Sequence, residues 1–336
     1  MNLFELTRAL VDIESITENE SRVGSFLYDH LAAIAARTGG RVERMAVERD
    51  RFNVLACWGN PVVTLSTHMD TVPPFFPSSE DAEFIRGRGA CDAKGIIASM
   101  TAAAEKLLGE GAKNFGLLFV VGEERNSAGA AAAALAGRGS RYLVNGEPTE
   151  NKLVLASKGA MRFEVVARGR MAHSAYPELG ESAIEKLLDA LDAIRRVPLP
   201  EDALLGRCTM NIGTIAGGRA PNVIPDLARA EIFVRLVDDP SALRDAFVAA
   251  VGARVEINEV LCIPPVRFAN VDGLPTSVVS FATDAPVFGK SWGEPLLLGP
   301  GSIHVAHTSE ERIAKKELVD AVEIYATVVK KLLAAA

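Results

Sequence analysis

Three apolar runs in the first half of the chain constrain its fold, because each ends close to potential metal ligands. The runs are Val62–Leu65, Phe115–Val121 and Tyr142–Val144. Imidazole and carboxylate side chains follow them: His68 and Asp70 the first, Glu123 and Glu124 the second, and Glu147 the third. In open α/β sheets, ligands bind just beyond the carboxyl ends of the strands. We therefore expect these side chains to meet at one edge of one sheet.

The order of the remaining elements predicts two domains in this 336-residue chain. A helix over Gly95–Leu108 alternates with the apolar runs, as in an α/β domain with a mostly parallel sheet. Beyond this, strand-like and helical patterns follow in the order β-α-β-β-α-β of a ferredoxin-like α+β module: 160–167, 182–194, 208–215, 228–236, 241–251 and 254–260. A last helix is expected near 315–333. We predict a first domain over 1–158 and 269–336, interrupted by a second over 159–268.

Composition excludes several classes of partner. The net charge of −7 argues against nucleic acid, which binds basic surfaces. The four cysteines form no CxxC pair, which favours reduced thiols in the cytoplasm. The N-terminus lacks the features of a signal peptide, and no apolar run is long enough to cross a membrane. We expect a cytoplasmic protein, and its composition does not indicate the substrate.

The chemistry of these ligands fits two divalent cations, because imidazole and carboxylate groups bind zinc and a carboxylate can bridge two ions. Asp92, in a short loop before the predicted helix, is the expected bridge. We expect one metal to take His68 and Glu147, and the other to take Glu124 and His307. Zinc is the expected metal, and cobalt is an alternative.

Two further acids have expected roles beside the ligands. Asp70 can accept a hydrogen bond from the His68 imidazole and so fix its tautomer. Glu123 is left as general base for the attacking water. Neighbouring side chains diverge on a strand, so Glu123 and Glu124 must lie on a turn, which Gly122 permits.

Each residue taken singly has another interpretation. Asp92 is suited to cap the following helix, and a Glu–Glu pair is typical of a solvated surface. Cys91 is a possible thiolate ligand, but the ligand set is complete without it and we interpret it as a small packed residue. The sequence contains no GxSxG, dinucleotide fingerprint, HExxH or Walker motif. The convergence of three strand ends favours the metal site.

Four blocks that contain these residues resemble the signature blocks of the M20 family of metallopeptidases and deacylases. They are Ser66–Val72, Gly87–Gly95, Gly122–Glu124 and Asn145–Thr149. The resemblance covers nearly the whole chain and implies the metal ligands given above, with Glu123 as the base. It also implies that the second domain is a lid that forms a homodimer.

The resemblance assigns further residues to the site, three of them in the second domain and one at the end of the first part of the first domain. His173, in the block Ala172–Pro177, is implied to polarise the scissile carbonyl, from its own chain or from the partner's. Asn222 and Arg235 match substrate-contacting positions, with Arg235 suited to clamp a carboxylate. A solvated charge at a strand end is the other interpretation of Arg235. Lys158 matches a basic position near the substrate carboxylate.

The subfamily rests on Glu147 and on the segment before His307. Leu298–Ile303, with Gly301 and Ser302 as expected substrate contacts, most resembles acetylornithine deacetylase. N-acetyl-L-ornithine is therefore the expected substrate, an N-acyl amino acid. A desuccinylase, a hydrolase that releases lysine or ornithine from a carrier protein, a dipeptidase or carboxypeptidase, and a non-catalytic binding protein are the alternatives. His304 is interpreted as pocket lining.

Overall fold

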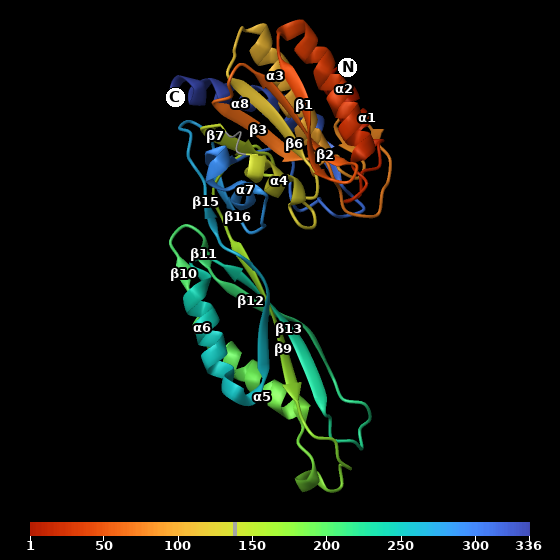
Figure 1. The fold of residues 1–336 in the computed structure, drawn as a ribbon, viewed down its shortest axis with the longest axis vertical. Helices are drawn as coiled ribbons and strands as arrows, with labels where there is room; N and C mark the ends of the chain where they lie inside the picture. Colours follow the sequence, from red (N-terminus) through yellow and green to blue (C-terminus); the bar gives the residue numbers. More distant parts are fainter. Residues whose placement is uncertain (137–139) are drawn as a thin grey trace. The chain divides into compact units, whose positions relative to one another are not determined.

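The computed structural model describes residues 1–136 and 140–336 and divides into two compact units. The first unit comprises Met1–Leu155, Phe268–Ser277 and Thr283–Ala336. The second comprises Ala156–Arg267 and Val278–Ala282. Figure 1 shows the helices and strands of both units. Each unit has its own hydrophobic core.

A mixed sheet forms the centre of the first unit, in the order β1-β2-β6-β3-β7-β17-β8. Two short strands, β15 (Val266–Arg267) and β16 (Thr276–Val279), each pair with β8 and extend this sheet. Its strands are β1 (Arg41–Glu48), β2 (Arg51–Trp58), β6 (Phe115–Val120), β3 (Val63–His68), β7 (Tyr142–Asn145), β17 (Glu294–Leu297) and β8 (Leu153–Ser157). The central strands β6, β3, β7 and β17 are parallel to one another, whereas β1, β2 and β8 pair antiparallel. The carboxyl ends of four strands therefore lie at one edge.

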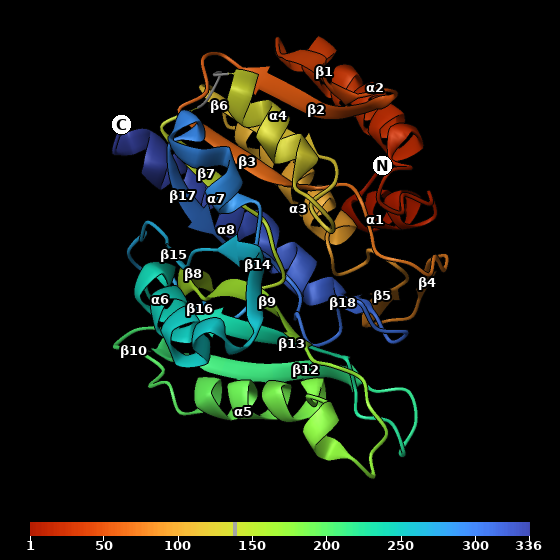
Figure 2. The ribbon, with the colours of Figure 1, turned by 60° about the horizontal axis from the view of Figure 1, so that its bottom comes forward.

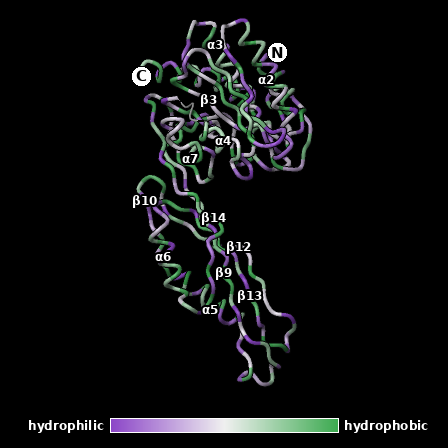
Figure 3. Tube along the Cα trace, viewed as in Figure 1, coloured by the Kyte–Doolittle hydropathy of each residue, from purple (hydrophilic) through white to green (hydrophobic). Residues whose placement is uncertain are grey.

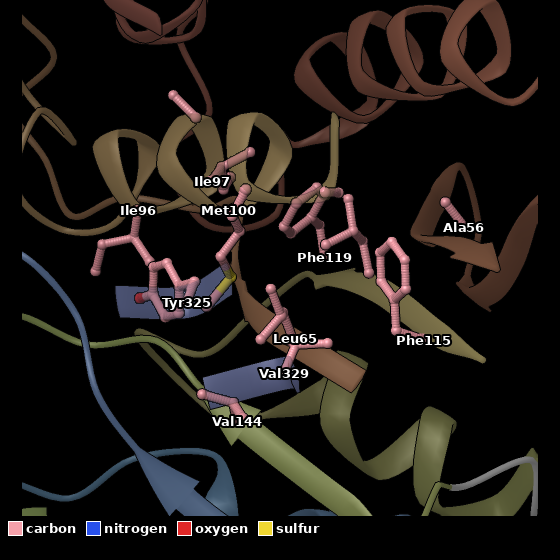
Figure 4. Close-up of a cluster of buried hydrophobic side chains, with 14 of the residues drawn as sticks. Ala56, Leu65, Ile96, Ile97, Met100, Phe115, Phe119, Val144, Tyr325 and Val329 are labelled. Atoms are coloured by element: carbon pink, nitrogen blue, oxygen red, sulfur yellow. The ribbon is translucent and has the colours of Figure 1, made fainter. Parts of the chain in front are cut away.

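Helices cover both faces of this sheet, which explains why β6 is apolar at every position. Leu117 and Phe119 share a core with α1 (Leu3–Val11), α2 (Ser21–Thr38), α3 (Lys94–Gly109) and α8 (Lys315–Ala334). Leu118 and Val120 point to the other face, toward α4 (Ala128–Ala136), α7 (Ala285–Phe288) and the 3-10 helix η3 (Gly289–Trp292). Figure 4 shows side chains of α3 and α8 packed around Leu65 and Phe119.

A small antiparallel sheet lies beside this core, in the order β18-β5-β4. Its strands are β18 (Arg312–Ala314), β5 (Phe84–Arg86) and β4 (Ser79–Glu80). The pairing of β5 with β18 brings the segment before Asp92 next to the segment that follows His307. Two parts of the chain that carry expected ligands are thereby joined.

The second unit is a four-stranded antiparallel sheet with two helices on one face (Figure 2). Its elements are β9 (Gly159–Arg168), η1 (Pro177–Leu179), α5 (Ala183–Arg195), β10 (Glu201–Asp202), β11 (Gly206–Arg207), β12 (Thr209–Gly217), β13 (Leu227–Leu236), α6 (Pro240–Val251), η2 (Gly252–Arg254), β14 (Glu256–Ile263) and β15, and β16 crosses the boundary between the units. The sheet order β12-β13-β9-β14 is that of a ferredoxin-like module. Exposed and buried residues alternate along β13. Figure 3 shows hydrophilic and hydrophobic segments interspersed along the strands of this unit.

The expected fold class, an α/β domain plus a ferredoxin-like module, is confirmed. The predicted strands and helices agree with the observed ones within a few residues. The domain boundaries stay a prediction, with the units dividing after Leu155 and after Arg267. Within the described residues, no helix combines the length and apolar character needed to span a membrane.

Candidate metal centre

The carboxyl ends of the parallel strands bring the expected ligands together. In register, His68 at the end of β3 pairs with Val120 at the end of β6, and Ser66 pairs with Asn145 at the end of β7. Glu124 and Glu147 each lie only a few residues beyond these ends. Parallel pairing thus gathers residues that are distant in the sequence.

Asp92 lies at the centre of the cluster, because its two oxygens contact different histidines. Oδ1 is 2.9 Å from His68 Nε2, and Oδ2 is 3.3 Å from His307 Nε2. His307 Nε2 is also 2.9 Å from Glu124 Oε1. Donor atoms of His68, Asp92 and Glu124 all lie within 4.8 Å of one another, as ligands of a shared metal site do. Asp92 does not cap α3, whose N-cap is Ala93.

The His68 imidazole is oriented by a backbone group. Its Nδ1 lies 3.0 Å from the carbonyl oxygen of Asp70 and 3.6 Å from the nearer oxygen of the Asp70 carboxylate. A carbonyl only accepts, so Nδ1 carries a proton, and Nε2, which faces Asp92 Oδ1, is the nitrogen that would bind a cation. The orientation expected of the Asp70 side chain is therefore supplied chiefly by its main chain.

The Asp70 carboxylate instead holds the turn that carries the two glutamates. Its Oδ1 accepts from the N–H groups of Gly122 at 2.9 Å and Glu123 at 3.1 Å, and its Oδ2 accepts from that of Glu124 at 3.2 Å. Thr17 donates to Oδ2 at 2.9 Å. Gly122 has φ +81°, which allows β6 to end in a tight turn.

Among the expected ligands, Glu147 has the surroundings that most favour a bound cation. It is buried, and its Oε1 has no hydrogen-bond partner among the described residues. Burial raises the pKa of its carboxyl well above the ordinary value, and the charges of Glu123 and Asp92 raise it further. A buried, unpaired carboxylate is costly unless it coordinates a metal, so these residues fit a divalent ion.

The electrostatics of the other members follow from the same crowding. Hydrogen bonds to Asp92 and Glu124 raise the pKa of His307 to about 10. Burial opposes protonation of His68, but its hydrogen bonds to Asp70 and Asp92 raise its pKa overall. The histidine protons therefore partly balance the acids of the protein without metal.

Glu123, the expected general base, has a carboxyl group whose pKa is strongly shifted. Burial raises the pKa of its carboxyl well above the ordinary range, the charge of His68 opposes this shift, and the charge of Asp284 adds to it. Carboxyl groups with raised pKa values are suited to proton transfer near neutral pH.

Gly301 and Ser302 lie against the loop of Asp92. Gly301 has φ +87°, and a Cβ there would lie 2.5 Å from Cys91 Sγ. The Cys91 thiol donates to the Ser302 carbonyl at 3.5 Å, and burial raises the pKa of this thiol. Cys91 is thus a packed thiol, as interpreted from the sequence. His304 is exposed.

The expected residues of the second unit lie in three places. His173 is exposed in a loop, where its Nδ1 accepts from the Ala175 N–H at 3.1 Å. Asn222 lies opposite, and its carbonyl accepts from the Ser174 N–H at 3.0 Å. The guanidinium of Arg235, on β13, lies 4.8 Å from the Phe233 ring centroid.

Lys158, the fourth of these residues, is engaged by the backbone. Its Nζ donates to the Arg207 carbonyl at 2.6 Å. Arg235, in contrast, has no salt bridge with any described residue, and partial burial lowers the pKa of its guanidinium. Arg235 is therefore the better candidate to bind a carboxylate.

A further acid, Asp284, lies just before α7 in the first unit and is not among the residues predicted from the sequence. It is buried, and neither of its carboxylate oxygens has a hydrogen-bond partner among the described residues. Burial raises its pKa to about 7. The only signal in the sequence is one acid in an otherwise uncharged segment, which is too common to single it out.

Comparisons with known proteins agree with this geometry. Residues 155–258 match the peptidase dimerisation domain family. A peptidase M20 domain-containing protein of Schizosaccharomyces pombe is 38% identical over 96% of this chain and 83% of its own length. The chain belongs to the M20 family of peptidases. A probable carboxypeptidase of Aspergillus flavus is 37% identical over 98% of this M20 chain and 86% of its own length.

The fold of this M20 chain also matches solved structures. Aminopeptidase PepT from Bacillus cereus superposes with a TM-score of 0.83 at 22% identity, over 99% of this chain and 98% of the other. The resemblance to the M20 family is thus confirmed, and the chain is an M20 metallopeptidase that hydrolyses amide bonds.

Proposed function

We propose that this M20 peptidase binds two divalent metal ions, bridged by Asp92. His68 and Glu147 would hold one ion, and Glu124 and His307 the other. This proposal rests on the position of the two Asp92 oxygens, each of which lies near a different imidazole. Oδ1 is 2.9 Å from His68 Nε2, and Oδ2 is 3.3 Å from His307 Nε2. Zinc suits this mixture of nitrogen and oxygen ligands, and cobalt is the expected substitute.

We propose Glu123 as the general base. When bound, the metal ions supply Lewis acidity and make water more acidic. Glu123 accepts a proton from the attacking water and then donates it to the leaving nitrogen of the amide. Asp70 positions Glu123 and Glu124 together through their backbone N–H groups. His173 is proposed to donate to the developing oxyanion.

The proposed substrate is an acyl group joined to an amino acid whose α-carboxylate is free. The name of the Aspergillus flavus relative, a probable carboxypeptidase, supports this class, which includes the C-terminal residue of a peptide. N-acetyl-L-ornithine, the substrate expected from the sequence, has the same acyl–NH–CHR–carboxylate group. We propose Arg235 as the carboxylate contact, because its guanidinium is half-buried without a salt bridge to a described residue.

The remaining substrate contacts and the homodimer are proposals of the same kind. Asn222, Lys158, Gly301 and Ser302 stay proposed contacts, each resting on its place in a family block. The match of residues 155–258 to peptidase dimerisation domains supports a homodimer through the second unit. Sedimentation of the purified chain would measure its assembly, and a monomer at micromolar concentration would contradict the proposal.

The proposal is tested by a hydrolysis panel with the zinc- and cobalt-loaded enzyme. The panel pairs N-acylated amino acids, including N-acetyl-L-ornithine, and N-blocked dipeptides with their C-terminal amides. Loss of a charge-assisted pair of hydrogen bonds should lower kcat/KM for the amides by about 100-fold or more. Cleavage only of substrates with a free α-amino group, regardless of amidation, would refute the proposed class.

A matched pair of variants tests the role of Arg235. Arg229 lies on the same strand but is exposed. Arg235→Met should remove the preference for a free carboxylate, whereas Arg229→Met should keep it. The quantity compared is kcat/KM for the acid substrate divided by kcat/KM for its amide. If this ratio is the same in Arg235→Met as in the wild type, the assignment is contradicted.

A further inference from the structure

A single buried carboxylate organises the loop that carries Asp92. Glu311 is 1% exposed, and its Oε1 accepts from three backbone N–H groups: those of Gly89 at 2.9 Å, Cys91 at 3.2 Å and Asp92 at 3.1 Å. These donors come from four consecutive residues of one loop. The loop is therefore wrapped around one oxygen atom that belongs to a distant part of the chain.

The second oxygen of Glu311 is held by an arginine of the same loop. Arg88 Nη1 lies 2.5 Å from Oε2, and the Arg88 side chain is 2% exposed. Arg88 also donates to the Pro74 carbonyl at 3.2 Å, and its guanidinium lies 4.9 Å from the Phe76 ring centroid. The carboxylate is thus fixed at both oxygens, and its partner is fixed to a further segment.

The loop depends on this external anchor for its shape. Gly89 has φ +87°, and a Cβ there would lie 2.9 Å from both Lys94 Cδ and Thr71 Cγ2. The Ala93 N-cap of α3 makes no side-chain hydrogen bond. Glu311 is therefore the group that satisfies the N–H groups at the start of this turn, which are costly to bury unpaired.

Glu311 also lies four residues after His307, in the segment that leads into β18. The Glu311 carbonyl accepts from the Gly87 N–H at 3.2 Å, and β18 pairs with β5 just before the loop. One short segment thus carries His307 and also fixes the backbone of Asp92.

We propose that Glu311 is a positioning residue that sets the place of the Asp92 carboxylate relative to His307. The proposal rests on the proposed role of Asp92 as a metal ligand. The hydrogen bonds between Glu311 and the loop are observed whether or not Asp92 binds a metal. Residues that orient metal ligands typically contribute 10- to 100-fold to metal affinity. A buried ion pair that served stability alone would leave the affinity of the folded protein unchanged.

The test uses Glu311→Ala and Glu311→Gln in the full chain, with Glu20→Gln as the matched control. Glu20 is also buried, and both its oxygens accept from Arg51, at 2.8 and 2.6 Å. Zinc affinity is measured by competition with a chelator. Deuterium uptake is measured in peptides over 87–92 and, as a reference, over 115–120.

Glu311→Ala should lower zinc affinity 10- to 100-fold and speed exchange over 87–92 at least tenfold, with 115–120 unchanged. Glu311→Gln should show smaller changes in both, because its amide oxygen still accepts from the loop. Glu20→Gln should leave both as in the wild type.

Three results would overturn the proposal. One is exchange that rises equally over 87–92 and 115–120, and another is zinc affinity in Glu311→Ala within twofold of the wild type. If Glu311→Ala does not fold, Glu311→Gln decides, and wild-type values of affinity and exchange in that variant overturn the proposal. Absence of zinc binding by the wild type would refute the proposed metal centre instead, while the exchange experiment on the loop still decides the role of Glu311.

Discussion

Replacing Asp70 by asparagine should destabilise the first unit more than any loss of exposed charge. The carboxylate is 0% exposed and accepts from the N–H groups of Gly122, Glu123 and Glu124 and from the Thr17 hydroxyl. Asparagine has the same shape, so the change alters charge and hydrogen bonding and leaves the packing intact. The effect therefore reports on the contacts that hold the glutamate turn.

The magnitude follows from counting these contacts. Hydrogen bonds to a charged group contribute about 1.5–3 kcal/mol each, and neutral ones contribute about 1 kcal/mol. The asparagine oxygen keeps the bonds to Gly122 and Glu123 at neutral strength, which loses about 2 kcal/mol in total. Its NH₂ group then faces the Glu124 N–H, and leaving that donor unsatisfied costs about 1–3 kcal/mol more. The Thr17 hydroxyl can turn to accept from the NH₂ group, so that contact loses little. The free energy of unfolding should fall by about 4 kcal/mol.

The assay is urea unfolding of the metal-free protein, followed by tryptophan fluorescence. Both tryptophans, Trp58 and Trp292, are buried in the first unit and report on that unit. Asp81→Asn is the control, because Asp81 also accepts from two backbone N–H groups, at 2.8 Å each, but is exposed. A much smaller loss is expected there. Equal losses in the two variants, or a loss below about 1 kcal/mol for Asp70→Asn, would refute the reasoning.

Three further predictions concern the metal centre and its supporting loop. Glu147→Gln should stabilise the metal-free protein at pH 7, because burial raises the pKa of this carboxyl and ionising it opposes folding. The same change should lower zinc affinity. A metal-free variant less stable than the wild type would contradict this prediction. The pKa of His307, raised to about 10, implies stabilisation of the metal-free protein that is complete below pH 6.5 and lost as the pH rises through 10. Since a ligating imidazole must be neutral, zinc binding at pH 7 should release a proton. Calorimetry in buffers of different ionisation enthalpy measures this release, and a release of zero would contradict the prediction. Gly301→Ala should lower the free energy of unfolding by about 2–4 kcal/mol, since its φ is +87° and its Cβ would meet Cys91 Sγ at 2.5 Å. The control is Gly206→Ala, because Gly206 has φ +70° and no atom within 4 Å of an added Cβ, and its free energy of unfolding should fall by only about 1 kcal/mol. Thermal unfolding measures both variants, and equal losses would contradict this reasoning.

The parallel strands could be predicted because their signal is local. The run around Phe115–Val120 is apolar at every position, as a strand buried on both faces requires, and it ends at Gly122. The rule that ligands lie beyond strand ends then indicated His68, Glu124 and Glu147 from sequence order alone. These predictions needed only the neighbouring residues.

Pairings between distant segments could not be predicted in the same way. Strand β17 is a four-residue run that contains a proline, and it enters the sheet between β7 and β8. Its place depends on segments more than a hundred residues away. Likewise, nothing near Glu311 in the sequence indicates that it binds the loop of Asp92, 219 residues before it. The principal contacts of the Asp70 carboxylate with the glutamate turn were missed for the same reason.

The central claim is tested most directly by metal content and turnover in two variants of adjacent residues, Glu123→Gln and Glu124→Gln. We expect about two metal ions per chain in Glu123→Gln, with kcat about 100- to 10,000-fold below the wild type, because the base is lost and the proposed ligands are kept. Glu124→Gln should lose one of the ions. Substantial turnover in Glu123→Gln, or loss of metal from that variant, would contradict the account.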